Sequence, residues 1–324
     1  SMSWSDRKIR VFDSDGNYIK EIGSGYGWGC NQWIYAYHLD IQNDQIYIYD
    51  YYNTTIKVIN LSGNCIKTKS FGAYWQGAGI AVSNNYVYVS GWFHSYIRVL
   101  DKNLNQVNFL SGNFSTYYGI KGIDVNSNGT KLVAAGYSLN KILEFNISGS
   151  NLSLARWTGS YGSGNYQFKS PSDVAYDSSD NIYIADLYNH RLVKFDSAGN
   201  YVSQYGSLNY NGNPFRYAYG VGISSTDKIY VADHGQTSIQ QFSTGLSYIG
   251  KIGVAKSRMS IAKEAIKRIV SDPQLKSGAN FGLMEWGFYW GNYLKLRVPI
   301  SSNGASTIYT DVDGVVANGG TYLL

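Results

Sequence analysis

The sequence has few of the residues from which metal centres, disulfide scaffolds and highly charged surfaces are built. Its 324 residues include 4 histidines, 2 cysteines and 4 prolines, and only 15% of them are charged. The formal net charge of +5 at pH 7 is too weak to argue for nucleic acid, so we expect no nucleic-acid partner. No apolar run approaches membrane-spanning length, so we expect no membrane span in this sequence either.

Tyrosine and glycine are abundant, with 31 and 36 residues, and the hydrophobic content of 44% is sufficient for a core. The stretch 171–206 alternates short β-branched and aromatic runs with polar turns. It predicts four antiparallel strands, with the second at 182–185, the third at 192–195 and the fourth at 201–205. So short a stretch forms one small sheet, which is not stable alone.

The same unit recurs along the chain and supplies neighbours for that sheet. Repeats of about 45 residues with four strands each predict blades around an axis, that is, an all-β propeller. The second strand of every unit should then occupy the equivalent place in successive sheets. The predicted second strands are 46–49, 87–90, 132–135, 182–185 and 229–232. A shorter copy at 9–23 contains only the second half of a unit.

The clearest unit resembles a known repeat. Ile182-Tyr-Ile-Ala-Asp is followed by Asn189-His-Arg-Leu and then by Phe195-Asp, a succession similar to the NHL repeat. The resemblance extends over residues 6–253 and implies a six-bladed propeller with an incomplete first blade. We therefore expect residues 1–253 to form an NHL-type propeller domain and residues 254–324 to form a separate, smaller αβ segment.

The blade pattern also bears on the two cysteines. It places Cys30 in a loop between blades at one face, and Cys65 at the start of an outer strand at the opposite face. A five-residue strand spans more than about 15 Å, which a disulfide cannot bridge without distortion. We expect both cysteines to be unpaired.

Because the strands of a blade alternate in direction, the connections between blades and the loops between second and third strands lie on the same side of a propeller. We call this side the connection face. These loops are unusually aromatic here, and Tyr and Trp give large contact areas at low entropic cost, so we expect this face to bind a ligand. Phe71, Phe168 and Tyr205 instead fit positions where the NHL pattern packs a ring between blades. The candidate ligand-binding residues are Trp28, Trp33, Tyr51, Tyr52, Tyr74, Trp75, Trp92, Phe93, Tyr117, Tyr118, Tyr161, Tyr166, Tyr188, Tyr210 and Tyr217.

Catalytic groups are sparse, and we expect no catalytic residue. Some propellers of this kind are lyases or hydrolases that bind a metal through their innermost strands, which keeps a metal enzyme as the alternative. The corresponding strands here contain His38, Asp40, Asp124 and Asp173, without a repeated histidine pattern. His190 fills a repeat position and is expected to hydrogen-bond within its blade. Asp50, Asp186 and Asp233 share one position of the unit and are expected to be structural, accepting hydrogen bonds from nearby loop amides.

The composition changes at Val254. Residues 257–272 have the apolar spacing of an amphipathic helix that ends before Pro273, whereas 281–288 and 294–300 are predicted strands and 311–317 a short helix. Three short motifs resemble, in order, a von Willebrand factor type A domain, most closely that of type IV pilus-tip adhesins. They are Arg258-x-x-x-Ala262-Lys263, Gly282-Leu-Met284 and Gly319-Gly-Thr321.

That resemblance implies a metal role for one residue. In an intact type A domain Thr321 would help to hold a divalent cation, Mg or Ca. The Asp-x-Ser-x-Ser loop and the second aspartate of the family have no counterpart in this sequence. Because a divalent ion needs oxygen ligands from several loops, we expect no cofactor in this fragment.

These features together favour a non-catalytic recognition or adhesion module, extracellular or on the cell surface, that binds a protein or glycan and belongs to a pilus-associated or cell-surface adhesin. The alternatives are a propeller lyase or hydrolase with a metal in the pore and, last, an RNA-binding NHL module, which would need a basic face. We favour a Ser- and Asn-rich surface over glycosylation as the explanation of the six Asn-x-Ser/Thr sequons. The sequons begin at Asn53, Asn60, Asn113, Asn128, Asn146 and Asn151.

Overall fold

The computed structural model describes residues 7–13, 16, 18–72, 77–91, 96–111, 119–207, 214–236 and 238–252, together with the backbone of 281–288 and 292–301. The chain divides into two compact units, Ser1–Val254 and Ala255–Leu324. Among the described residues, no helix is long and apolar enough to cross a membrane.

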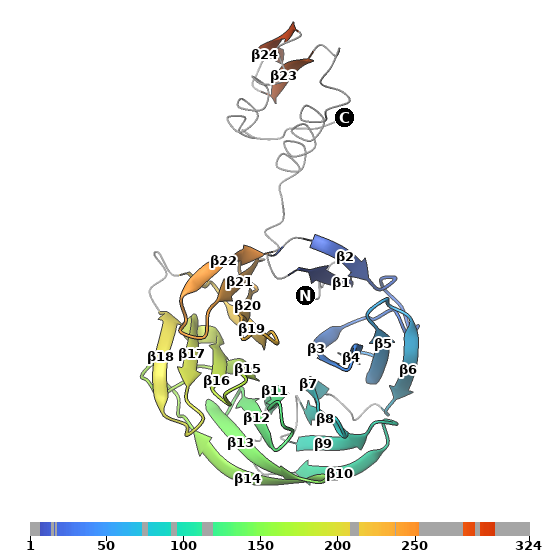
Figure 1. The fold of residues 1–324 in the computed structure, drawn as a ribbon, viewed down its shortest axis with the longest axis vertical. Coiled ribbons are helices and arrows are strands. Elements are labelled where there is room, and N and C mark those ends of the chain that lie inside the picture. Colours follow the sequence, from blue (N-terminus) through green and yellow to red (C-terminus); the bar gives the residue numbers. More distant parts are fainter. Residues whose placement is uncertain are drawn as a thin grey trace. The chain divides into compact units, whose positions relative to one another are not determined.

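The first unit is a β-propeller. Five four-stranded antiparallel sheets follow one another around an axis, and in each sheet the chain runs from the innermost strand to the outermost (Figure 1). The innermost strands are β3 (Ala36–Gln42), β7 (Gly77–Val82), β11 (Ile120–Val125), β15 (Pro171–Tyr176) and β19 (Ala218–Ile223). The second strands are β4 (Gln45–Asp50), β8 (Tyr86–Gly91), β12 (Lys131–Gly136), β16 (Ile182–Asp186) and β20 (Ile229–Asp233), which confirms the predicted positions.

The outer half of each blade is equally regular. The third strands are β5 (Thr55–Asn60), β9 (Tyr96–Asp101), β13 (Lys141–Ser148), β17 (Arg191–Phe195) and β21 (Ser238–Phe242). The outermost strands are β6 (Cys65–Ser70), β10 (Gln106–Ser111), β14 (Asn151–Thr158), β18 (Tyr201–Gly206) and β22 (Tyr248–Ile252). A 3₁₀ turn, η1 (Leu187–Asn189), connects β16 to β17.

Among the described residues the complete blades number five, not the six blades that the NHL resemblance implied. A further sheet has only two strands among the described residues, β1 (Ile9–Phe12) and β2 (Tyr18–Ile22). Its sequence corresponds to the third and outermost strands of a unit, and we call it the half-blade. It lies in the ring between β22 and the sheet β3–β6 (Figure 1).

The half-blade closes the ring by packing on both neighbours. On one side, its turn residue Gly16 faces Ile252 so closely that a Cβ there would lie 2.8 Å from the Ile252 side chain. On the other side, the Lys20 ammonium donates to the Leu61 carbonyl at 2.6 Å.

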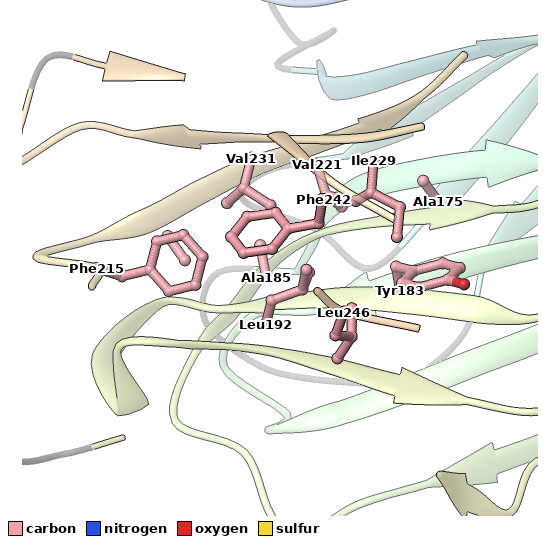
Figure 2. Close-up of a cluster of buried hydrophobic side chains, with 11 residues drawn as sticks. Ala175, Tyr183, Ala185, Leu192, Phe215, Val221, Ile229, Val231, Phe242 and Leu246 are labelled. Atoms are coloured by element: carbon pink, nitrogen blue, oxygen red, sulfur yellow. The ribbon is translucent and has the colours of Figure 1, made fainter. Parts of the chain in front are cut away.

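The hydrophobic core lies between the faces of adjacent sheets. In Figure 2, Tyr183 and Leu192 of one blade pack with Val231 and Phe242 of the next. Burying a side chain of this size stabilises a fold by about 1.5–3 kcal/mol, so Phe242→Ala would weaken this contact. The predicted wedges occupy such clusters: Phe168 is fully buried, and Phe71 and Tyr205 pack against neighbouring clusters.

The prediction for the cysteines was wrong, because Cys30 and Cys65 form a disulfide with Cα atoms 5.6 Å apart. The prediction assumed that the loop between β2 and β3 stays at the connection face. Instead the loop descends along the outer strands, so that the Cys30 Sγ lies 3.6 Å from the carbonyl oxygen of Lys67 in β6. The loop itself covers the length of the strand between the two faces, so it brings Cys30 within bonding distance of Cys65.

In the second unit, β23 (Phe281–Phe288) pairs antiparallel with β24 (Asn292–Ser301). These strands lie where the sequence predicted them. The predicted helices at 257–272 and 311–317, and Thr321, lie outside the described residues. A two-stranded pair occurs in many folds, so the type A resemblance stays a prediction.

Candidate ligand-binding face and channel

The repeated aspartates fix the loops of the connection face. Each carboxylate, at the end of a second strand, accepts hydrogen bonds from backbone amides of the loop that enters its own blade. The donors are Ile34 and Tyr35 for Asp50, Lys169 for Asp186, and Arg216 and Tyr217 for Asp233. The structural role predicted for these residues is confirmed. The amide of His190 donates to the Leu187 carbonyl within its own blade, and its ring also bonds to the carbonyl of Arg216, in the loop that enters the next blade.

Two of the loops, 25–33 and 160–168, have the same construction. In the first, the Gln32 side chain accepts a hydrogen bond from the Gly29 amide at 3.1 Å. In the second, Gln167 does the same with Gly164 at 3.0 Å. We call them the twin loops.

A buried cation holds each twin loop from below. Lys57 donates to the carbonyls of Gly29 and Gln32, and its side chain is only 1% exposed. Burial lowers the pKa of Lys57, and the nearby Asp50 carboxylate partly offsets that effect. In the other loop the guanidinium of Arg191 donates to the carbonyls of Ser163, Gly164 and Gln167. Arg191 also pairs with Asp186 at 2.9 Å.

Each twin loop carries a highly exposed ring. Trp28 and Tyr161 are both 70% exposed. Because the backbone beneath them is tied by side-chain hydrogen bonds, a ligand that packs on these rings need not order the loops first, which lowers the entropic cost of binding.

Tyrosines from different loops meet on the connection face. The ring centroids of Tyr35 and Tyr52 are 5.9 Å apart. The hydroxyls of Tyr137 and Tyr188, on adjacent blades, are 3.4 Å apart, and Tyr188 also packs edge-on to Tyr217 at 6.5 Å. The aromatic side chains therefore form contacts across blade boundaries.

The candidate residues divide into four groups. Trp28, Tyr52, Tyr161 and Tyr188 are exposed, and Tyr51 and Tyr217 are half-buried. Tyr166 is exposed, but its hydroxyl accepts the amide of Tyr201 at the hairpin end of β18, away from the connection face. Trp33 is only 1% exposed, so its predicted role in binding is wrong. The candidates outside the described residues are Tyr74, Trp75, Trp92, Phe93, Tyr117, Tyr118 and Tyr210.

Trp33 is buried because it occupies the wedge position of its loop. It aligns with Phe168 of the twin loop, and it packs in a cluster with Ile9, Ile22 and Ile48. The repeat pattern that identified Phe168 as a wedge could also have identified Trp33.

The innermost strands contribute charged side chains near the axis of the propeller, and we call this axial region the channel. His38 of β3 lies 3.3 Å from the Asp173 carboxylate of β15. Three carboxylates each accept a hydrogen bond from a backbone amide of the next innermost strand. These bonds satisfy amides at the inner edges of the blades that would otherwise have no partner in a sheet. The pairs are Asp40 with Val82 at 2.6 Å, Asp124 with Tyr176 at 2.7 Å and Asp173 with Val221 at 3.0 Å.

Burial strongly shifts the protonation of these groups. It would lower the pKa of His38, but the adjacent Asp173 carboxylate outweighs this and raises the pKa to about 9. Burial, reinforced by the charge of Asp40, raises the pKa of Asp124 to about 8. Asp124 is therefore largely protonated at neutral pH, whereas His38 is a cation paired with Asp173.

Sequence reasoning missed Lys121, a buried channel residue on β11. Its ammonium lies 3.5 Å from the ring centroid of Tyr219 and 5.1 Å from that of Tyr137. Burial lowers the pKa of Lys121 to about 7, although Asp173 acts in the opposite direction. An alignment of the innermost strands would have shown that its position faces the channel.

Within the part of the chain that the structure describes, no group of three or more His, Cys, Asp or Glu side chains could hold a metal ion. The channel carboxylates direct their oxygens to backbone amides and to His38 instead. This arrangement ties blades together and leaves few oxygens for a cation.

Comparisons with known proteins agree with the fold. The NHL repeat family matches residues 168–195, the unit from which the repeat was recognised. No curated protein matches the sequence.

Solved structures extend the likeness over the propeller. The protein is similar to selenomethionine-substituted virginiamycin B lyase from Staphylococcus aureus, with 14% identity, a TM-score of 0.52 and coverage of 69% of this chain and 72% of that one. A chain of the nidogen/laminin complex gives 14% identity and a TM-score of 0.53, covering 67% and 79%. A protein of unknown function from Bacteroides caccae gives 12% and 0.57, covering 78% and 91%. At these identities the likeness shows the propeller fold alone.

Proposed function

We propose that the protein is a non-catalytic recognition module that binds a protein or glycan through the exposed rings of its connection face and of the two twin loops that descend from that face along the outer strands. The observation that carries this proposal is the pair of twin loops, each tied down by a buried cation and each presenting a ring that is 70% exposed. Fixed aromatic rings favour binding, because their large contact area is gained at little entropic cost.

The channel is the place where the alternative, a lyase or hydrolase, would act. Its carboxylates already accept backbone amides from neighbouring blades. These contacts support a structural role for the channel. The exposed aromatic side chains lie outside the channel, so a binding function explains them better than catalysis in the channel does.

We also propose an extracellular or cell-surface location. The Cys30–Cys65 disulfide supports it, since disulfides persist mainly in oxidising compartments. The finer proposal, that the protein is part of a pilus-associated or cell-surface adhesin, depends only on the type A resemblance of residues 254–324.

A matched pair of tryptophan variants tests the proposed function. The full chain, as wild type, Trp28→Ala and Trp33→Ala, is applied to arrays of immobilised glycans and extracellular proteins, and its melting temperature is measured in parallel. Trp28→Ala should weaken binding by about 2 kcal/mol or more and leave the melting temperature nearly unchanged. Trp33→Ala should cost about 3–5 kcal/mol of stability.

Tyr161→Ala provides an independent check on the second twin loop, with the same expectation as Trp28→Ala. Binding that survives both changes in exposed rings would contradict the proposal.

A further inference from the structure

The turns that connect the innermost strand of each complete blade to its second strand lie on the face opposite the connection face, and we call them the inner turns. Between most neighbouring complete blades, a side-chain hydrogen bond joins one inner turn to the next. The pairs, with the donor first, are Gln42 with Asn84 at 2.7 Å, Asn126 with Asp180 at 3.1 Å and Ser178 with Asp227 at 2.6 Å.

The boundary between the second and third blades differs from the others. Here the inner turn 83–86, between β7 and β8, faces the inner turn 126–130, between β11 and β12. Among the described residues no hydrogen bond joins these two turns, and a cavity of about 200 Å³ lies between them. The ring of inner turns is therefore open at this boundary, where a ligand can enter.

The side chains that line this cavity leave several polar groups unused. Asn85 and Ser127, one from each turn, make no side-chain hydrogen bond in the described part of the chain. Gln42 and Asn84 share a single bond, which leaves the Gln42 side-chain oxygen as an acceptor and the Asn84 side-chain nitrogen as a donor. The cavity thus offers donors and acceptors from three blades.

The chemistry of the lining selects among possible ligands. None of the described residues that line the cavity is charged, and burying a charged ligand without a charged partner is costly. Hydroxyl groups both donate and accept, as the amide side chains here do, so a neutral polyhydroxylated ligand matches them. Val82, Val125 and Ile147 add apolar surface for its C–H groups. The volume is below the range of about 300–1,000 Å³ for drug-sized ligands and suits a single sugar ring.

We propose that this cavity binds the ring of a neutral sugar, whose hydroxyls bridge the inner turns of the second and third blades. Both turns are fixed before the ligand arrives. The Ser83 hydroxyl accepts the Tyr86 amide at 3.1 Å, and the Asn126 side-chain oxygen accepts the amides of Thr130 and Lys131 at 2.9 Å. Binding therefore orders little of the protein, which lowers its entropic cost.

Saturation-transfer difference NMR on the full chain tests the proposal. The probes are the methyl pyranosides of glucose, galactose and mannose, with methyl glucuronide as the charged control. At least one neutral ring should bind, and the glucuronide should bind more weakly than it does. Trp28→Ala and Tyr161→Ala should leave this binding unchanged, so the result is independent of the function proposed for the exposed rings.

A matched pair of variants locates the site. The double variant Asn85→Ala, Ser127→Ala removes two exposed polar side chains without breaking a described hydrogen bond, and it should weaken sugar binding at least about fivefold. Ser179→Ala removes an equally exposed hydroxyl from the inner turn of the fourth blade and should leave binding unchanged.

A disaccharide ending in the ring that binds best identifies the source of the sugar. Binding as tight as that of the single ring supports the end of a glycan, and weaker binding supports a free sugar. The proposal is overturned if none of the neutral rings binds and the cavity holds water only, if the glucuronide binds equally well, or if the double variant retains full binding.

Discussion

The imidazole of His38 and the carboxylate of Asp173 are separated by 135 residues in sequence and lie 3.3 Å apart in the channel. The pair joins the first complete blade to the fourth. His38 also lies 3.0 Å from the carbonyl oxygen of Ile80 on the next blade, so one side chain connects three sheets.

The ion pair predicts a pH-dependent contribution to stability. The pKa of His38 rises from 6.5 to about 9 on folding, so its stabilisation is complete below pH 6.5 and is lost as pH rises through 9. Compared with His38→Gln, the wild type should be more stable by the order of 1–3 kcal/mol at pH 6, and the difference should shrink by pH 9.5. Urea denaturation across this range measures it. Lys121, Asp40 and Asp173 are present in both proteins, and a pH-independent difference would contradict the assignment.

At neutral pH the buried Asp124 carboxyl should destabilise the fold, whereas the His38–Asp173 pair stabilises it. Its pKa rises from 3.8 to about 8, so the folded state favours the protonated form and loses stability as pH rises between these values. Asp124→Asn keeps an acceptor for the Tyr176 amide and removes the charge. The variant should therefore gain stability relative to wild type from pH 4 to pH 8, by at most about 1.4 kcal/mol per pH unit.

Asp101→Asn is the matched control for that series. The exposed Asp101 carboxylate accepts the amides of Asn103 and Asn105, and the hydrogen bond from Asn105 is the main cause of its lowered pKa. Its contribution is present above pH 3.8, so this variant should lose stability relative to wild type there. Equal behaviour of the two variants would refute the raised pKa of Asp124.

The disulfide should contribute measurably to stability. Cys30 and Cys65 are 35 residues apart in sequence, and closing a loop of that size stabilises a fold by about 2–4 kcal/mol. The Cys30→Ser, Cys65→Ser double variant should unfold at correspondingly lower denaturant concentration. Thiol titration of the unfolded, unreduced wild type should find no free thiol, and two free thiols would show that the bond does not form.

The cation beneath a twin loop is predicted to be essential to the fold. Arg191→Met leaves Asp186 buried without its ion-pair partner and three loop carbonyls without a donor, which should cost about 3–5 kcal/mol. Lys131→Met removes a half-exposed pair with Asp180 and should cost about 0–1 kcal/mol. Chemical denaturation measures the free energy of unfolding of the two variants. Similar losses of stability would contradict the role of Arg191 in fixing the loop.

The repeat pattern predicted the strands correctly because their alternation and turn residues are local signals. It also identified Asp50, Asp186 and Asp233, since a residue that recurs at one place in the unit makes the same contact in each blade. It failed where a loop leaves the repeat, as for Cys30, whose position depends on the path of a connection. Lys121 was missed because its environment depends on Tyr219, two blades further along the ring, as well as on Tyr137 of its own blade, and the pattern within one unit does not encode the first of these contacts.

The closure between Gly16 and Ile252 has a mechanical consequence. Every other boundary between neighbouring sheets is crossed by the chain itself, so separating those sheets would require a loop to extend. At this boundary the described contact between the two sheets is side-chain packing, with Gly16 against Ile252. The chain also leaves the propeller from β22 and enters it at β1, so tension applied to both ends would act directly on this boundary. Under load, the ring should open there first.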